Sequence, residues 1–196
     1  MEMKSYLSPN NTKALKGIMA IAVVLSHIYT SGVFRFESSA LAFIFGSVLG
    51  YVPVSVFFFL SGYGLMCSYK SKGKDYIRHF PRNRLLPFYI TIVLAIIIYF
   101  ILHISMGDGV SLFQLFKSFT LGGTIITYGW YLQTILLLYF IFWLCFSLKI
   151  EDTKKVYVFC LAVSILYVVS YFIGVTPYMV CNCTMYGIWN DLESIR

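Results

Sequence analysis

The fold class follows from residues 85–104, which read LLPFYITIVLAIIIYFILHI and contain no Asp, Glu, Lys or Arg. A helix rises about 1.5 Å per residue and the hydrocarbon core of a bilayer is about 30 Å thick, so roughly 20 apolar residues span it. The stretch lacks the alternation of a strand, and an open sheet edge in lipid would leave backbone amides without hydrogen-bond partners. It therefore predicts a transmembrane helix.

Four other stretches have the same character, at residues 17–34, 40–67, 128–148 and 156–175. Of the 196 residues, 59% are hydrophobic and only 12% are charged, whereas about 25% of the residues of a soluble domain are charged. This composition excludes a soluble enzyme, a disordered tail and a disulfide-stapled secreted module. We expect an all-α, polytopic transmembrane bundle of about five spans, forming a single domain over residues 1–196.

Residues 105–127, between the third and fourth spans, have a different pattern. Apolar residues at helical spacing surround the polar Gln114 and Lys117; they are Leu112, Phe113, Leu115, Phe116 and Phe119. This pattern is typical of an amphipathic helix that lies in the membrane interface. We expect such a helix here, ending near Gly122 and Gly123.

The distribution of Lys and Arg predicts the orientation in the membrane, because short cytoplasmic loops retain positive charge. Twelve of the fifteen basic residues fall on one side, in the N-terminal segment and in the second and fourth connections. The other side holds Arg35, Lys117 and Arg196. The N-terminus is therefore expected to be cytoplasmic. A net charge of +7 would suggest a nucleic-acid partner in a soluble protein, but here the bilayer accounts for it and no nucleic acid is expected.

Lys16 and His27 are the first candidate functional residues. Eleven helical residues at about 100° each complete three turns and 20° more, so both side chains project from one face, about 16 Å apart along the axis. Lys16 is then at the cytoplasmic mouth and His27 near the bilayer midplane. Ionisable residues at that depth usually face a bundle interior or a wet cavity. A neutral histidine is the natural general base near neutral pH.

Each of these two residues also has a structural interpretation. The structural interpretation of His27 is a neutral histidine that donates one N–H to a neighbouring helix. Lys16 alone resembles a flanking lysine that extends its ammonium group to the membrane surface. The residues by themselves leave both alternatives open.

Two glycine-containing motifs in the second stretch indicate helix packing rather than chemistry. Residues 57–64 read FFFLSGYG, and Gly46 and Gly50 form a G-x-x-x-G motif. Small residues of this kind let helix backbones approach closely in membranes.

The basic connection before the third span reads RHFPRNRLLP over residues 78–87. Retention of positive charge on the inner side and attraction to anionic headgroups explain most such clusters. The functional alternative is a landing site for a phosphate-rich cytoplasmic ligand, with the guanidinium groups of Arg78, Arg82 and Arg84 as donors.

Taken together, four motifs resemble the acyltransferase 3 family of integral-membrane enzymes. They are Lys16-Gly17-Ile18 with His27, the run Phe57–Tyr63, Arg84-Leu85-Leu86-Pro87, and Trp130-Tyr131-Leu132. The resemblance covers residues from about Asn11 to Phe172, and its most specific element is the basic residue ten residues before the first-span histidine.

The resemblance implies transfer of an acyl group, most often acetyl, from cytoplasmic acyl-CoA to a hydroxyl of a cell-surface carbohydrate. It implies His27 as the essential histidine, Lys16 as its basic partner, and a multi-pass location in a bacterial plasma membrane. The family's R-x-x-R pattern matches only at its second position, Arg84, because Pro81 stands at the first. Family members carry more spans, so the resemblance also implies an N-terminal portion whose C-terminal half is missing or is supplied by a second chain.

A non-enzymatic membrane protein is the alternative, as a small transporter or a catalytically inactive, truncated remnant. Acidic residues are missing from all five stretches, which disfavours a transporter because transporters place charged residues inside their spans. No metal is expected, because the zinc-binding H-E-x-x-H motif is absent.

Overall fold

The computed structural model describes residues 8–34, 36–121, 125–126 and 129–172. Helices and their connections make up this part of the chain, with no strand in it, which confirms the all-α prediction. Two compact units divide the chain, residues 1–65 and residues 66–196, and each is described by itself.

The first unit begins with α1 (Pro9–Thr30). Ser8 caps the helix: its hydroxyl accepts a hydrogen bond from the amide of Asn11 at 3.3 Å. Pro9 occupies the first turn, where a missing N–H costs nothing. The helix therefore starts eight residues before the apolar stretch that predicted it, because cap and proline form a start signal of their own.

After α1 the chain turns back through α2 (Ser39–Phe43) and the π-helix η1 (Ile44–Val48) into α3 (Leu49–Phe80). Four aromatic rings fill this turn, with centroids 4.8–6.2 Å apart. They belong to Tyr29, Phe34, Phe36 and Phe45. The cluster joins the end of α1 to η1.

The G-x-x-x-G motif packs α1 against η1 and the start of α3. A Cβ atom at Gly50 would lie 3.1 Å from the hydroxyl of Ser26, and one at Gly46 would lie 3.3 Å from the ring of Tyr29. Ser26 is buried at this contact. The packing interpretation of the motif is confirmed at both glycines.

The long helix α3 begins in the first unit, ends in the second, and is bent at Gly73. The backbone there has φ 58° and ψ −138°, a conformation that glycine adopts far more readily than other residues. Beyond the bend the helix continues to Phe80, and the π-helix η2 (Pro81–Leu85) leads into α4. The sequence analysis predicted neither π-helix.

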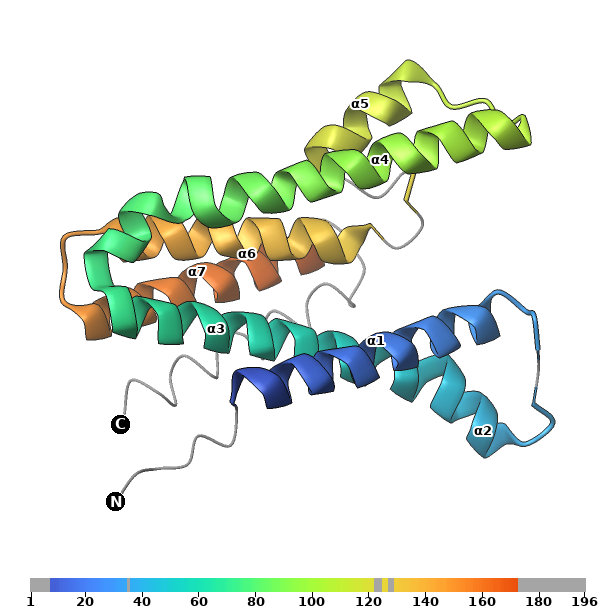
Figure 1. The fold of residues 1–196 in the computed structure, drawn as a ribbon, viewed down its shortest axis with the longest axis horizontal. Helices are drawn as coiled ribbons and strands as arrows, with labels where there is room; N and C mark the ends of the chain where they lie inside the picture. Colours follow the sequence, from blue (N-terminus) through green and yellow to red (C-terminus); the bar gives the residue numbers. More distant parts are fainter. Residues whose placement is uncertain (1–7, 35, 122–124, 127–128, 173–196) are drawn as a thin grey trace. The chain divides into compact units, whose positions relative to one another are not determined.

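The second unit contains α4 (Leu86–Met106), α5 (Leu112–Leu121), α6 (Trp130–Ser147) and α7 (Asp152–Phe172). Figure 1 shows α6 between α4 and α7, with α5 folded back along the end of α4. The helix expected within residues 105–127 is present as α5. Its expected end at Gly122 and Gly123 lies outside the described residues.

Aromatic side chains form the centre of the second unit. Phe80, Phe142 and Phe159 are fully buried. The Phe142 ring lies 5.6 Å from that of Phe80 and 6.0 Å from that of Phe159, between centroids. A smaller cluster of Ile92, Ile96 and Ile126 packs against the inner face of α5. These contacts join α3, α6 and α7 on one side and α4 and α5 on the other.

Within the described residues, three helical stretches are long and apolar enough to cross a membrane: Asn10–Thr30, Ser39–Met106 and Trp130–Ser147. The middle stretch, 68 residues long, contains two of the expected spans. The fifth, 156–175, coincides with α7 and continues past Phe172, outside the described residues.

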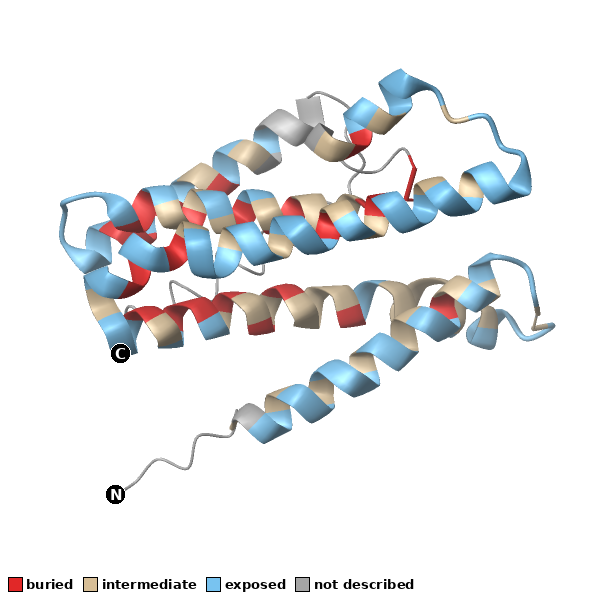
Figure 2. Ribbon diagram, turned by 45° about the horizontal axis from the view of Figure 1, so that its top comes forward, coloured by how far each residue is buried: buried red, intermediate tan, exposed pale blue. Residues whose placement is uncertain are grey.

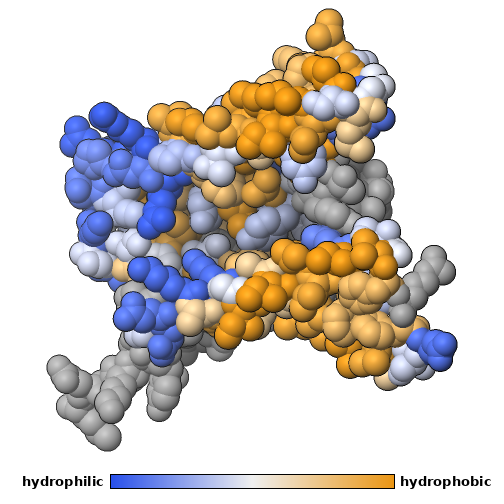
Figure 3. Space-filling view, turned by 45° about the vertical axis from the view of Figure 1, so that its right-hand side comes forward, coloured by the Kyte–Doolittle hydropathy of each residue, from blue (hydrophilic) through white to orange (hydrophobic). Residues whose placement is uncertain are grey.

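Large apolar side chains on the outer faces of these helices are exposed, as expected for surfaces in contact with lipid. On α4 they include Leu94, Ile98 and Ile101. Figure 2 shows α1 and α4 exposed along much of their length, and Figure 3 shows hydrophobic surface over α4 and α5. The protein is therefore an α-helical, multi-pass membrane protein.

Candidate functional site

Helix α1 carries both Lys16 and His27, so the expected helical relation between them holds. Half-buried and buried residues form a stripe along α1, at Thr12, Leu15, Met19, Ala22, Val23, Ser26 and His27. Ile18, Ile21 and Val24 lie on the other faces and are more than half exposed. His27 thus belongs to the inward stripe rather than to the lipid-facing surface, and Lys16 is exposed.

The closest packing of α1 flanks His27 in the sequence. Ser26 precedes it and contacts the position of Gly50; Tyr29 follows two residues later and contacts that of Gly46. The hydroxyl of Thr30 donates to the carbonyl oxygens of Ser26 and His27, at 3.0 and 3.1 Å. Because the backbone around His27 is fixed from both sides, the imidazole projects from a well-defined point on α1.

The three candidate donor-binding arginines lie in the second unit. Arg78 is in the last turn of α3, and Arg82 and Arg84 are in η2; all three are exposed. Figure 3 shows hydrophilic surface at the end of this unit where η2 and the α6–α7 connection lie. The structure therefore groups the three arginines at one end of the second unit and keeps Lys16 and His27 together on α1.

The sequence analysis missed a cluster of Tyr69, Asp152 and Lys155. The ammonium Nζ of Lys155 donates to Asp152 Oδ1 at 2.8 Å and to the hydroxyl of Tyr69 at 2.9 Å. The Tyr69 hydroxyl donates to the same Asp152 oxygen at 2.7 Å. In the sequence Lys155 is one of several lysines expected on the cytoplasmic side. The one feature that indicates the cluster is the three-residue spacing of Asp152 and Lys155, which lets them pair on one face of a helix.

The charges in this cluster stabilise each other. Hydrogen bonds from Lys155 and then from Tyr69 lower the pKa of the Asp152 carboxyl below its ordinary value. Burial alone would lower the pKa of the Lys155 ammonium, but its bonds to Asp152 and Tyr69 outweigh that effect and raise it. Both groups are therefore charged at neutral pH.

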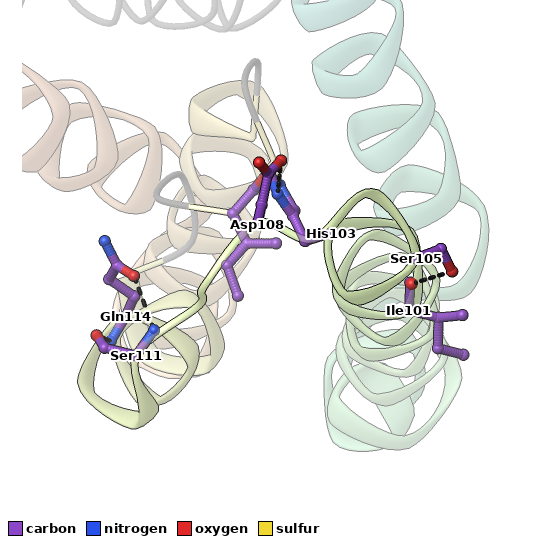
Figure 4. A network of polar contacts seen from close by, with 7 residues as sticks. Ile101, His103, Ser105, Asp108, Ser111 and Gln114 are labelled. Atoms are coloured by element: carbon purple, nitrogen blue, oxygen red, sulfur yellow. Dashed lines mark hydrogen bonds and ion pairs between the residues drawn. The ribbon is translucent and has the colours of Figure 1, made fainter.

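His103, to which the sequence assigned no role, ties together the opposite end of the second unit. Its Nδ1 lies 3.1 Å from Asp108 Oδ2, and its Nε2 lies 3.4 Å from the carbonyl oxygen of Ile125. Figure 4 shows the pair beside the start of α5, where the hydroxyl of Ser111 accepts from the amide of Gln114 and the Gln114 side chain accepts from the amide of Ser111. These contacts hold the turn between α4 and α5.

In the described part of the chain, no three His, Cys, Asp or Glu side chains gather as ligands for a metal ion.

Comparison with known proteins gives one match. Residues 11–188 match the family described as an acyltransferase domain, acyltransferase 3. No curated protein and no solved structure gives a significant match.

Proposed function

Because the chain belongs to the acyltransferase 3 family, we propose that it moves an acyl group, acetyl in the simplest case, from acyl-CoA to a hydroxyl of a cell-surface carbohydrate. The family match and the multi-pass helical fold support an acyltransferase of a membrane. The acetyl group, the CoA donor, the carbohydrate acceptor and the plasma membrane are the finer parts of the proposal.

His27 is the proposed general base. It would take the proton of the acceptor hydroxyl while the hydroxyl oxygen attacks the thioester carbonyl carbon. The carbon–sulfur bond then breaks, the acyl group stays on the acceptor oxygen, and the proton passes to the leaving thiolate. The single observation that carries this role is the position of His27 on the inward stripe of an apolar helix, three turns from the basic Lys16.

Arg78, Arg82 and Arg84 are the proposed binding groups for the phosphates of CoA. All three guanidinium groups are exposed at one end of the second unit, and a guanidinium can donate two parallel hydrogen bonds to a phosphate. In the proposed orientation this end is cytoplasmic, where acyl-CoA is available. Lys16, at the same side of the membrane, is proposed as the basic partner of His27.

The variant His27→Ala tests the catalytic role. Membranes carrying the protein are incubated with radiolabelled acetyl-CoA and a crude cell-surface carbohydrate fraction, and label in the carbohydrate is measured. Loss of a general base should lower the rate by about 10² to 10⁴. The matched control is His79→Ala, because His79 is exposed and its contacts within the described residues are to Asp75, near the end of α3.

Two results would contradict the proposal in different ways. A rate within a few fold of wild type in His27→Ala would remove His27 from the mechanism. No transfer and no binding of acetyl-CoA by the wild-type protein, with the protein correctly inserted, would favour the non-enzymatic alternative.

A further inference from the structure

The cluster of Tyr69, Asp152 and Lys155, called the clasp below, contains a charged group that the proposed mechanism does not use. The Lys155 side chain is only 2% exposed, whereas that of Asp152 is 71% exposed. A buried ammonium is costly unless it is paired and hydrogen-bonded. Here two of its three N–H groups are bonded within the clasp, so the clasp joins α3 to the first turn of α7.

The clasp is also packed from the apolar side. The ring of Tyr69 meets that of Phe146 edge to face at 4.8 Å, and the Lys155 ammonium lies 5.5 Å from the centre of the Tyr69 ring. Val156 and Phe159, which follow on α7, are buried. The position of Tyr69 is therefore fixed by bonds to its hydroxyl and by packing on its ring.

Tyr69 lies four residues before the bend at Gly73. Beyond the bend is the basic segment, residues 74–84, which carries Arg78, Arg82 and Arg84. The end of the segment is anchored to α6 by Phe80, which is fully buried and packs on Phe142. Beyond the bend, Tyr76 and Ile77 are the next buried residues. The clasp therefore attaches α3 to α7 one helical turn before the chain changes direction.

We propose that the clasp is a positioning site for the acyl donor: by holding Tyr69 against α7, it sets where the basic segment presents its arginines to phosphate groups. This inference rests on the proposed function for the identity of the ligand. Lys155 acts through Tyr69 and the bend and does not touch the donor. Its contribution is to binding of the donor rather than to the acyl-transfer step.

The test compares Lys155→Met with Lys154→Met in the full-length protein in detergent. Methionine keeps most of the length of lysine and removes the charge and its hydrogen bonds. Lys154, on the same turn, is exposed, and its partner among the described residues is the exposed Glu151 at 3.6 Å. We expect Lys155→Met to raise the Kd for CoA about tenfold, as for the loss of one good contact, and Lys154→Met to leave it within twofold. In the transfer assay KM for acetyl-CoA should rise while kcat stays near wild type.

Two tyrosines supply a second matched pair. Tyr69→Phe removes the hydroxyl bonded to Lys155 and Asp152, and should weaken CoA binding in the same direction as Lys155→Met. Tyr76→Phe removes a buried hydroxyl that has no hydrogen-bond partner in the described structure, and should leave CoA binding unchanged. This pair keeps the test valid if Lys155→Met fails to fold.

Hydrogen exchange separates failure of the clasp from failure of the proposed function. In Lys155→Met, faster amide exchange confined to residues 70–84 and the start of α7 supports positioning, whereas wild-type exchange there overturns it. Uniformly faster exchange, or a wild-type Kd for CoA, also overturns it, because the clasp would then be only a general stabilising contact. If the wild-type protein binds no CoA, the proposed function fails and exchange in residues 70–84 alone decides whether the clasp positions the segment.

Discussion

Lys155 has a different role in the structure from the one that its sequence position predicts. In the sequence it is one of three lysines in a short connection and serves only to orient the chain. In the structure it is almost inaccessible and its ammonium is bonded to a tyrosine 86 residues away. No local pattern indicates Tyr69 as its partner, because the two are joined only after α3 and α7 have packed on α6.

Asp152 predicts a pH dependence at this scale. Its pKa is lower in the folded protein than in the unfolded chain, so the clasp stabilises the fold fully above the ordinary carboxyl pKa, about 3.9. That stability is lost as pH falls through the lowered value. At pH 6 the wild-type protein should melt at a higher temperature than Asp152→Asn. The expected difference in the free energy of unfolding is about 1 kcal/mol, as for the loss of one hydrogen-bonded contact.

The measurement is thermal unfolding of both proteins in detergent between pH 6 and pH 3. The difference between them should shrink as the pH falls below the ordinary carboxyl pKa, because the unfolded chain then binds a proton at Asp152 more readily than the folded protein does. A difference that stays constant over this range would show that the charge of Asp152 does not contribute.

Helix elements follow from the sequence more completely than single contacts do. Apolar stretches predicted α1, α4 and α6, and the alternation of Phe and Leu with Gln114 and Lys117 predicted α5. These patterns do not predict the π-helices, because a turn that is wider than that of an α-helix is not indicated by amino-acid composition. The start of α1 lies before the apolar stretch, because Ser8 caps the helix and Pro9 fits its first turn.

At the scale of an element, the bend in α3 predicts the effect of Gly73→Ala. A Cβ atom there would meet no neighbour within 4 Å, so the cost comes from the backbone conformation alone. We expect destabilisation of about 1–3 kcal/mol, measured by thermal unfolding, together with weaker CoA binding. Gly17→Ala is the matched control, because Gly17 lies inside α1 with equally open space. Equal effects of the two substitutions would rule out strain at Gly73 as the cause.

For the whole molecule, the distribution of Lys and Arg predicts the orientation of the chain in the membrane, which helix packing alone does not determine. In the second unit the α3–α4 and α6–α7 connections lie at the same end (Figure 1), and both are basic. The helices therefore alternate in direction as the count of Lys and Arg requires. Arg35 and Arg196, counted on the opposite side, lie outside the described residues.

This orientation predicts which sites an impermeant reagent reaches. Lys72→Cys and Gly109→Cys both introduce a thiol at an exposed position. Lys72 is in the last part of α3, before η2 and α4, and Gly109 is in the connection that follows α4. In intact cells a membrane-impermeant maleimide should label Gly109→Cys above the background of the native cysteines, and should label Lys72→Cys only after lysis. The reverse pattern would invert the topology and place the proposed donor-binding arginines outside the cell.

The candidate site could be predicted only in part, because some of its features depend on local sequence and others on how the helices pack. Lys16, His27 and the arginines are found from spacing and from family resemblance, because these depend on local sequence. The inward stripe that contains His27 and the clasp beside the basic segment depend on which helices pack together, which composition does not encode.

The two glycines opposite Ser26 and Tyr29 have a last consequence for the histidine between those residues. Position 26 meets position 50 and position 29 meets position 46, so the paired segments run antiparallel with one defined axial register. If α1 slid by one turn so that Thr30 replaced Ser26, a larger side chain would lie against Gly50, where a Cβ atom would already be only 3.1 Å from the Ser26 hydroxyl. The two missing side chains thus restrict the axial position of α1, and with it that of the imidazole.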